Sequence, residues 1–192
     1  MDFKLFNIKC CNILKNINKE DGLYQYYDER IKNKEILNID DRLLINYFLE
    51  NVEKKNNILE IAAGLGQVSH YLNLNGFKNI TINECNKKRF ILARKLNSEF
   101  SNNCLTSLCK YQNLDINTYD YIFTLNGVSS HIGNINDLPI FEIFLNNGKK
   151  IILKEGYFGY LGNTSFTDKL KEKYNYETLF NIDNGDILLF YK

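Results

Sequence analysis

The chain has 192 residues, a formal net charge of +1, and ordinary shares of hydrophobic (44%) and charged (24%) residues. These values fit a globular domain with a sizeable core, and they exclude a large basic field that would gather nucleic acid or an acidic membrane. No apolar run approaches the roughly 18 residues of a membrane span, and the N-terminus lacks a signal-peptide pattern. The five cysteines include no Cys-x-x-Cys pair and no zinc-like spacing, which favours a reduced, cytoplasmic protein without a metal site.

The N-terminal part of the chain is expected to be helical. Apolar residues recur at helical spacing in Asp41–Glu53, and Tyr24–Lys34 is a second candidate helix. The chain has no internal repeat and no Pro/Gly/Ser-rich linker. We therefore predict a single domain over residues 1–192, in which residues 1–56 form a helical cap segment on a core of residues 57–192.

From Asn57 onward, short apolar runs alternate with helical patterns. Such alternation indicates parallel strands joined by crossover helices. Pro139 suits the first turn of one of these helices, and Gly148 suits its end. The expected strands are Asn57–Ala62, Asn79–Glu84, Cys104–Cys109, Tyr121–Leu125 and Lys150–Lys154.

The C-terminal end of the chain changes pattern. Two strand-like runs, Tyr176–Ile182 and Asp186–Tyr191, flank the tripeptide Asp183-Asn184-Gly185. Asn-Gly between two such runs is a strong hairpin signal, because both residues tolerate positive φ. The predicted fold class is therefore α/β: a doubly wound, mostly parallel sheet with a C-terminal antiparallel hairpin and helices on both faces.

A glycine-containing turn follows the first predicted strand, in the segment Glu60-Ile61-Ala62-Ala63-Gly64-Leu65-Gly66. Glycine lets the backbone approach a ligand closely, and the helix that follows offers free N–H groups to a polar ligand. An acidic residue, Glu84, ends the next strand about twenty residues later, where a carboxylate accepts hydrogen bonds from ribose hydroxyls. Together these features predict a site for a nucleoside-containing cofactor.

The pattern Glu60-x-Ala62-x-Gly64-x-Gly66 resembles the first motif of the class I (Rossmann-like) S-adenosylmethionine-dependent methyltransferases, an acidic residue followed by three alternating glycines. The resemblance covers about Asp41–Lys192 and includes the antiparallel C-terminal hairpin of that family. It implies that the cofactor is S-adenosylmethionine (SAM). It also implies that Glu60 orients the methionine end of the cofactor, and that Ala62, Gly64 and Gly66 form the loop beneath it.

The same resemblance implies three further cofactor contacts. Glu84 would hold the ribose, Cys85 would flank the adenine, and Asn126, at the end of the fourth strand, would lie near the transferred methyl group. Two features depart from the family pattern. Ala62 replaces the usual first glycine, and Lys110–Asn113 lacks the aspartate that often binds the adenine amine.

Two alternatives stay open beside an active methyltransferase. The first is a NAD-binding Rossmann protein, whose fingerprint requires Gly or Ala where this chain has Ser69. The second is a methyltransferase-like module that binds a cofactor or a partner without catalysis. For an active enzyme, His131 follows the fourth strand and is the candidate general base. The expected acceptor is a small molecule, such as a sugar or metabolite hydroxyl or amine; there is no strong nucleic-acid or membrane signal, and the oligomeric state stays open.

Two further interpretations concern side chains outside the motif. His70, on the first crossover helix, is expected at the surface. Tyr24, Tyr26 and Tyr27 are interpreted as packing residues of the N-terminal segment with their hydroxyls at the surface, and capping of the cofactor site is the alternative.

Overall fold

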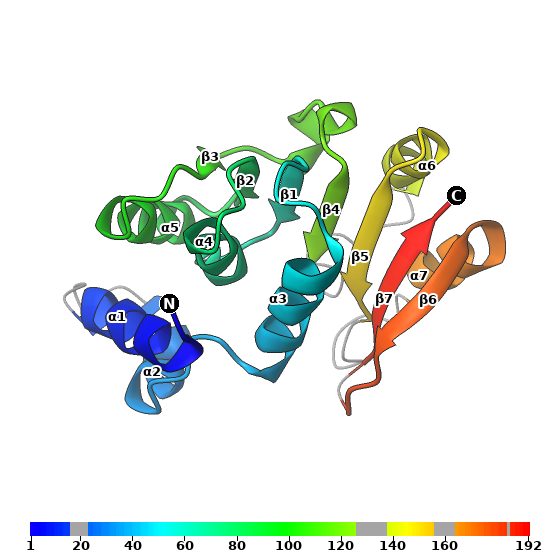
Figure 1. Cartoon of the computed structure of the whole chain (residues 1–192). Coiled ribbons are helices and arrows are strands. Elements are labelled where there is room, and N and C mark those ends of the chain that lie inside the picture. The colour runs from blue at the N-terminus through cyan, green and yellow to red at the C-terminus, as the bar shows by residue number, and fades with distance from the viewer. Residues whose placement is uncertain (16–22, 126–137, 156–163, 184) are drawn as a thin grey trace.

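The computed structural model describes residues 1–15, 23–125, 138–155, 164–183 and 185–192. Its N-terminal part consists of three helices, α1 (Phe3–Lys15), α2 (Leu23–Lys32) and α3 (Ile39–Asn51). In Figure 1, α1 and α2 lie together beside α5, whereas α3 crosses toward the middle of the sheet. The helices predicted around Tyr24 and Asp41 are confirmed, and α1 lies in a segment for which no element was predicted.

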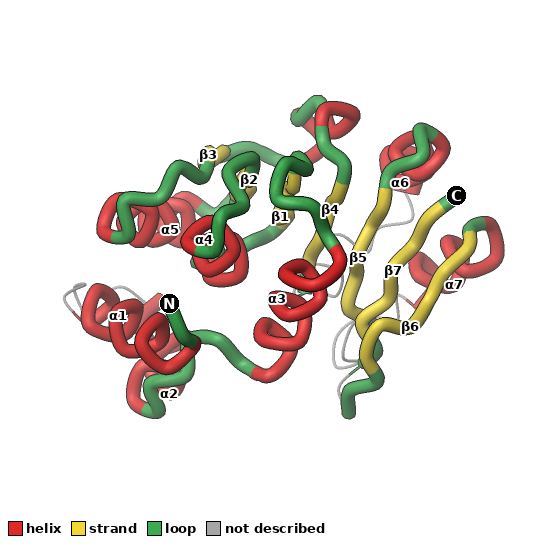
Figure 2. The backbone as a smooth tube through the Cα atoms, viewed as in Figure 1, coloured by secondary structure: helices red, strands yellow, loops and turns green. Residues whose placement is uncertain are grey.

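The strands form one seven-stranded sheet with the order β3-β2-β1-β4-β5-β7-β6 (Figure 2). The first five strands are parallel, whereas β7 pairs antiparallel with both β5 and β6. The predicted mostly parallel sheet with a C-terminal antiparallel hairpin is therefore confirmed. The strands are β1 (Ile58–Ile61), β2 (Ile80–Asn83), β3 (Leu105–Ser107), β4 (Tyr121–Thr124), β5 (Lys150–Lys154), β6 (Asn175–Phe180) and β7 (Ile187–Tyr191).

The crossover segments are mainly helical, as predicted. Pro139 lies in the first turn of its helix, where a missing N–H is harmless, and Gly148 follows the helix with a φ of 73°. The α-helices of this part are α4 (Gln67–Leu74), α5 (Lys87–Glu99), α6 (Leu138–Asn146) and α7 (Thr164–Lys173), with short 3-10 turns at Tyr111–Asn113 and Ile116–Thr118.

Side chains alternate between the two faces of the sheet and build two hydrophobic clusters. On one face, Ile58, Tyr121 and Phe123 join residues of α1 to α5. On the other face, Leu59 and Ile122 join residues of α6 and α7. This alternation is the period of two expected for strands covered on both sides. Helices on both faces of the sheet are thus confirmed.

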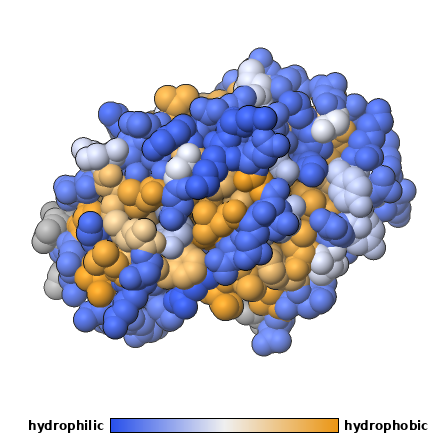
Figure 3. Space-filling model, viewed as in Figure 1, coloured by the Kyte–Doolittle hydropathy of each residue, from blue (hydrophilic) through white to orange (hydrophobic). Residues whose placement is uncertain are grey.

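The outer surface of these helices is largely polar. Figure 3 shows hydrophilic residues over most of the visible face, with hydrophobic residues between them around its centre. Within the described ranges, no helix has the length and apolar character needed to cross a membrane.

The expectation that His70 lies at the surface is wrong. The His70 side chain is fully buried, with Nε2 3.1 Å from the Ala93 carbonyl oxygen and Nδ1 3.2 Å from the Asn102 amide. Seven of the eight residues of α4, from Gln67 to Asn73, are buried. Because α4 is covered by α3, α5 and β2, it has no solvent-facing side on which a polar residue would be exposed.

Candidate functional site

The turn between β1 and α4 adopts the backbone conformation that its small residues allow. Ala62, Gly64 and Gly66 all have positive φ, at 52°, 61° and 65°. A Cβ atom on Gly66 would lie 2.9 Å from a methyl carbon of Ile82, so a larger residue would collide with β2. Ala62 keeps the loop conformation despite its Cβ atom, as expected for the smallest replacement of glycine, but it does so in a region that L-residues avoid.

Glu84 is attached to this turn by hydrogen bonds. Its carboxylate accepts from the Gly64 backbone N–H at 2.8 Å through Oε2 and from the Asn86 backbone N–H at 2.8 Å through Oε1. The side chain is only 2% exposed. Each carboxylate oxygen has a second lone pair, so both retain the capacity to accept a further hydrogen bond. The glycine turn and the acid at the end of β2, both expected from sequence to line a cofactor site, are therefore in direct contact with each other.

Two more buried carboxyl groups lie around the turn. Glu60, in β1, accepts a hydrogen bond from the Ser69 backbone N–H at 3.3 Å, and burial raises its pKa to about 8, with repulsion from Asp41 and Glu84 adding to the rise. Burial likewise raises the pKa of Asp41 to about 6. The Gln67 amide lies 3.4 Å from both Asp41 oxygens. The site therefore concentrates buried carboxyl groups whose ionisation is opposed by burial.

Helix α3 supplies Asp41 because of how the helix begins. Asn38 and Asp41 form a capping box, in which each side chain accepts a hydrogen bond from the other's backbone N–H. The neighbouring Asp40 forms an ion pair with Lys154 at the end of β5, and its Oδ2 lies 2.5 Å from the Lys154 Nζ. Asp41 is not among the site residues expected from sequence, although an Asn followed three residues later by Asp is a recognisable helix-start signal.

The structure brings most of the residues expected from sequence into one place. The expected loop and carboxylate residues meet at the carboxyl edge of β1 and β2, and Cys85 follows Glu84 as an exposed free thiol. Asn126 and His131 lie outside the described residues. In the described part of the chain, no group of three or more His, Cys, Asp or Glu side chains is arranged to hold a metal ion. The residues brought together are Glu60, Ala62, Gly64, Gly66 and Glu84.

Comparison with solved structures supports the assignment of this architecture. The chain matches WbdD, described as a bifunctional kinase-methyltransferase, with a TM-score of 0.69 and 14% identity over 94% of this chain and 46% of that one. It therefore spans less than half of WbdD. It matches magnesium protoporphyrin IX methyltransferase (ChlM) from Synechocystis with bound SAM, with a TM-score of 0.65 and 10% identity over 99% and 93% of the two chains. The fold is that of the class I methyltransferases.

A third methyltransferase shows the same architecture over a shorter match. Precorrin-6y C5,15-methyltransferase from Geobacter metallireducens gives a TM-score of 0.60 and 16% identity, over 79% of this chain and 87% of that one. No protein-family model and no curated protein matches the sequence. The chain therefore shares the fold of these methyltransferases, with sequence identities of 10% to 16%.

Proposed function

We propose that this protein is a SAM-dependent methyltransferase. The observation that carries the proposal is the convergence of Asp41, Glu60 and Glu84 on a glycine turn that opens a helix, within the class I methyltransferase fold. SAM combines a ribose diol with a sulfonium and an ammonium group, so it presents hydrogen-bond donors and positive charge. Buried carboxyl groups complement both features.

Each residue of the site has a distinct role in this proposal. Glu84 accepts hydrogen bonds from the ribose hydroxyls while it holds the turn through the Gly64 N–H. Glu60 complements the positive charge of the methionine portion. Gly64 and Gly66, with Ala62, keep the backbone close to the cofactor. Cys85 and Asn126 are proposed to flank the adenine and the methyl group, respectively.

The chemistry requires little covalent participation by the protein. When bound, SAM supplies a methyl group on a positively charged sulfur, which makes the thioether a good leaving group. The protein's contribution is to align the acceptor with the methyl group and to exclude water. For a hydroxyl acceptor, the oxygen bonds to the methyl carbon as the carbon–sulfur bond breaks, and we assign His131 as the base that takes the hydroxyl proton.

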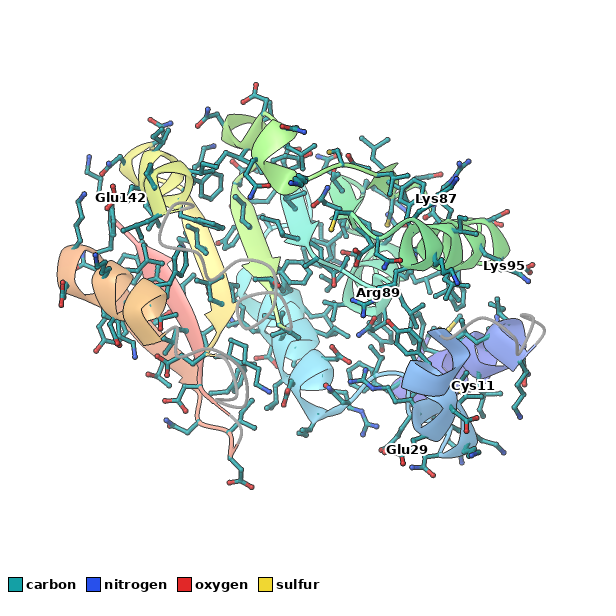
Figure 4. The ribbon with its side chains drawn as sticks, turned by 180° about the vertical axis from the view of Figure 1, so that it is seen from behind. Cys11, Glu29, Lys87, Arg89, Lys95 and Glu142 are labelled. Atoms are coloured by element: carbon teal, nitrogen blue, oxygen red, sulfur yellow. The ribbon has the colours of Figure 1, made fainter. Side chains whose placement is uncertain are left out.

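We propose a small-molecule acceptor, such as the hydroxyl or amine of a sugar or metabolite. The two methyltransferases from Synechocystis and Geobacter metallireducens are named for porphyrin and precorrin substrates. The near-neutral charge of the chain provides no broad surface for nucleic acid. Figure 4 shows that the basic residues labelled on α5 do not gather on one face, because Arg89 lies on the side toward α2 and Lys87 on the opposite side. Nucleic-acid oligomers are included in the acceptor screen as a check on this proposal.

We further propose that residues 1–192 form one domain, with residues 1–56 as a cap on the Rossmann-like core. A single hydrophobic cluster that includes Phe6 of α1, Leu44 of α3 and Ile82 of β2 supports this arrangement. We also propose that the protein acts in the cytoplasm, where five unpaired cysteines would stay reduced.

The proposal is tested by titration calorimetry with S-adenosylhomocysteine (SAH) and NAD, followed by an acceptor screen that monitors SAH release from SAM. We expect SAH to bind with a Kd in the micromolar range, roughly −8 kcal/mol. Binding of NAD without a response to SAH would overturn the proposal in favour of a nicotinamide site. Binding of SAH without turnover on any acceptor would favour a non-catalytic module.

A further inference from the structure

Strands β2 and β3 lie side by side (Figure 1), and a cysteine follows the end of each. Asn83 of β2 pairs with Ser107 of β3. Cys85 and Cys109 each stand two positions beyond these paired residues. The pairing continues past the strands, because the Glu84 backbone N–H donates to the Ser107 carbonyl oxygen at 3.1 Å. Alternate residues of a strand share a face of the sheet, so this register directs both cysteines to the same face.

The Cys109 thiol lies against the end of β2. Its Sγ is 3.7 Å from the Asn83 side-chain nitrogen and 3.1 Å from the Ser107 hydroxyl oxygen. The same Asn83 amide donates to the Cys109 carbonyl oxygen at 3.1 Å. Neighbouring strands lie about 4.8 Å apart, and a disulfide joins α-carbons roughly 4.4–6.8 Å apart. Cysteines in register on two neighbouring strands are therefore within the range of a disulfide.

The five thiols differ in their access to an oxidant. Cys85 is exposed and Cys109 is partly exposed, and both are free thiols in this structure. The other three cysteines are buried, and burial raises the pKa of each thiol; they are Cys10, Cys11 and Cys104. The thiolate is the form that reacts with oxidants. Oxidation should therefore begin at the strand ends rather than at the buried thiols.

We propose that Cys85 and Cys109 are an oxidative modification site and form a reversible disulfide when hydrogen peroxide reaches the protein. The Cys85 thiolate attacks one peroxide oxygen, the oxygen–oxygen bond breaks, and a sulfenic acid forms as the other oxygen leaves as water. The Cys109 thiolate then attacks the Cys85 sulfur, the sulfur–sulfur bond forms, and a second water leaves. The peroxide gains the two electrons that the thiols lose, and a thiol reductant reverses the reaction.

The disulfide alters the place where the cofactor adenine is proposed to bind. Cys85 follows Glu84, the proposed ribose ligand, and is itself proposed to flank the adenine. Joining Cys85 to Cys109 withdraws the Cys85 side chain from the adenine, so the oxidised protein binds SAM more weakly. The disulfide follows from register and exposure alone, whereas its effect on the cofactor rests on the proposed SAM-binding function. Disulfides of cytoplasmic proteins are usually transient and redox-sensing, as a reversible pair of this kind is.

The disulfide is tested by peptide mapping. Wild-type protein is treated with hydrogen peroxide, the remaining thiols are alkylated, and mass spectrometry of the digest identifies linked peptides. We expect a cross-link between Cys85 and Cys109 that dithiothreitol removes. Cys109→Ser should form none, and the matched control Cys11→Ser, on α1 away from these strand ends (Figure 4), should form the wild-type cross-link. Oxidation of the wild type without this cross-link overturns the proposal.

The effect on the cofactor is tested by calorimetry with SAH before and after oxidation. We expect the cross-linked wild type to bind SAH at least ~10-fold more weakly than the reduced protein, with recovery after dithiothreitol. Cys109→Ser, in which this disulfide cannot form, should lose much less affinity. Bound SAH should also slow cross-linking of the wild type, a measurement that needs no variant.

The outcomes separate this inference from the proposed function. Cross-linked protein with unchanged SAH affinity overturns the effect on the cofactor. If the reduced wild type does not bind SAH, the proposed function fails and the effect on the cofactor fails with it. Peptide mapping then still decides whether Cys85 and Cys109 form the disulfide.

Discussion

The Glu84 carboxylate and the Gly64 backbone N–H, twenty positions apart in the sequence, are joined by a 2.8 Å hydrogen bond inside the protein. The same carboxylate also accepts from the Asn86 N–H just before α5. Glu84 therefore connects the end of β2 with the turn after β1 and with the start of the next helix. A residue proposed to hold the cofactor ribose is at the same time part of the framework that shapes the cofactor loop.

This dual role separates two substitutions of Glu84. Glu84→Gln keeps one acceptor oxygen but removes the charge, so we expect SAH affinity to fall by about 1.5–3 kcal/mol with a modest loss of thermal stability. Glu84→Ala leaves the Gly64 and Asn86 N–H groups without this partner, and the buried Gly64 N–H alone costs a further ~1–3 kcal/mol of unfolding free energy. Calorimetry and thermal unfolding measure the two effects, with Glu50→Gln, an exposed acid on α3, as the control. Unchanged SAH affinity in Glu84→Gln would make Glu84 purely structural.

Ala62 offers a test of backbone strain in the loop. Its φ of 52° lies in the left-handed region, which costs an L-residue roughly 1–2 kcal/mol and costs glycine nothing. Glycine also destabilises the folded state by about 0.5–1 kcal/mol, because it gives the unfolded chain more conformational entropy. The net effect of Ala62→Gly on the free energy of unfolding should therefore lie between zero and a gain of ~1 kcal/mol, which corresponds to a Tm rise of up to about 4 °C. The neighbouring Ala63, which lacks positive φ, is the matched control, because Ala63→Gly should lower Tm. A clear fall in Tm for Ala62→Gly would contradict the strain argument.

The fold was predictable because its signals are local. Most strands are short apolar runs, and the hairpin is marked by Asn184-Gly185 between two strand-like runs. The glycine turn and Glu84 were also predictable, because a strand, a turn and a helix of fixed spacing place them at neighbouring strand ends.

The parts that sequence analysis missed depend on contacts between distant segments. Nothing in the pattern around Tyr27 indicates that its hydroxyl meets Gly64, because that contact depends on how α2 packs against the core. His70 was assigned to the surface because an amphipathic helix normally has a polar exposed side. Here Ala93 and Asn102 supply partners for its ring, so the polar side chain is buried at little cost.

The raised pKa of Glu60 predicts that cofactor binding is linked to proton release. With a pKa of about 8 in the unliganded protein, Glu60 is largely protonated at neutral pH, and an arriving positive charge favours its ionised form. Affinity for SAM should therefore increase between about pH 6 and 9, by at most ~10-fold per pH unit. Calorimetry in buffers of different ionisation enthalpy measures the released proton. Glu60→Gln cannot ionise at this position. We expect this variant to bind SAM more weakly than the wild type and to show little increase in affinity between about pH 6 and 9.

The same pKa has a consequence for stability. Because the folded-state pKa of Glu60 lies above its ordinary value of 4.5, the folded protein holds a proton that the unfolded chain releases. Stability is therefore lost as pH rises from about 4.5 through about 8. Unfolding by urea should show Glu60→Gln gaining on the wild type by at least ~1 kcal/mol between neutral pH and about pH 9. Parallel stability curves for the two proteins would contradict a strongly raised pKa at Glu60.

His70 predicts the opposite pH dependence. Burial lowers the pKa of His70 from 6.5 to about 4. Between these pH values, His70 is protonated in the unfolded chain but neutral in the folded protein. The free energy of unfolding therefore falls as pH decreases through this range. Between about pH 7.5 and pH 5, this group alone should remove roughly 2 kcal/mol of unfolding free energy.

The measurement is urea unfolding of the wild type and His70→Gln at both pH values. Gln retains an amide donor for the Ala93 carbonyl oxygen but does not titrate, so the variant should lose correspondingly less stability on acidification, whatever its stability at neutral pH. His131 and all carboxyl groups are common to both proteins and cancel in the difference. An equal loss in the two proteins would show that His70 accepts a proton in the folded state near its ordinary pKa, and that its burial does not control the acid stability of the fold.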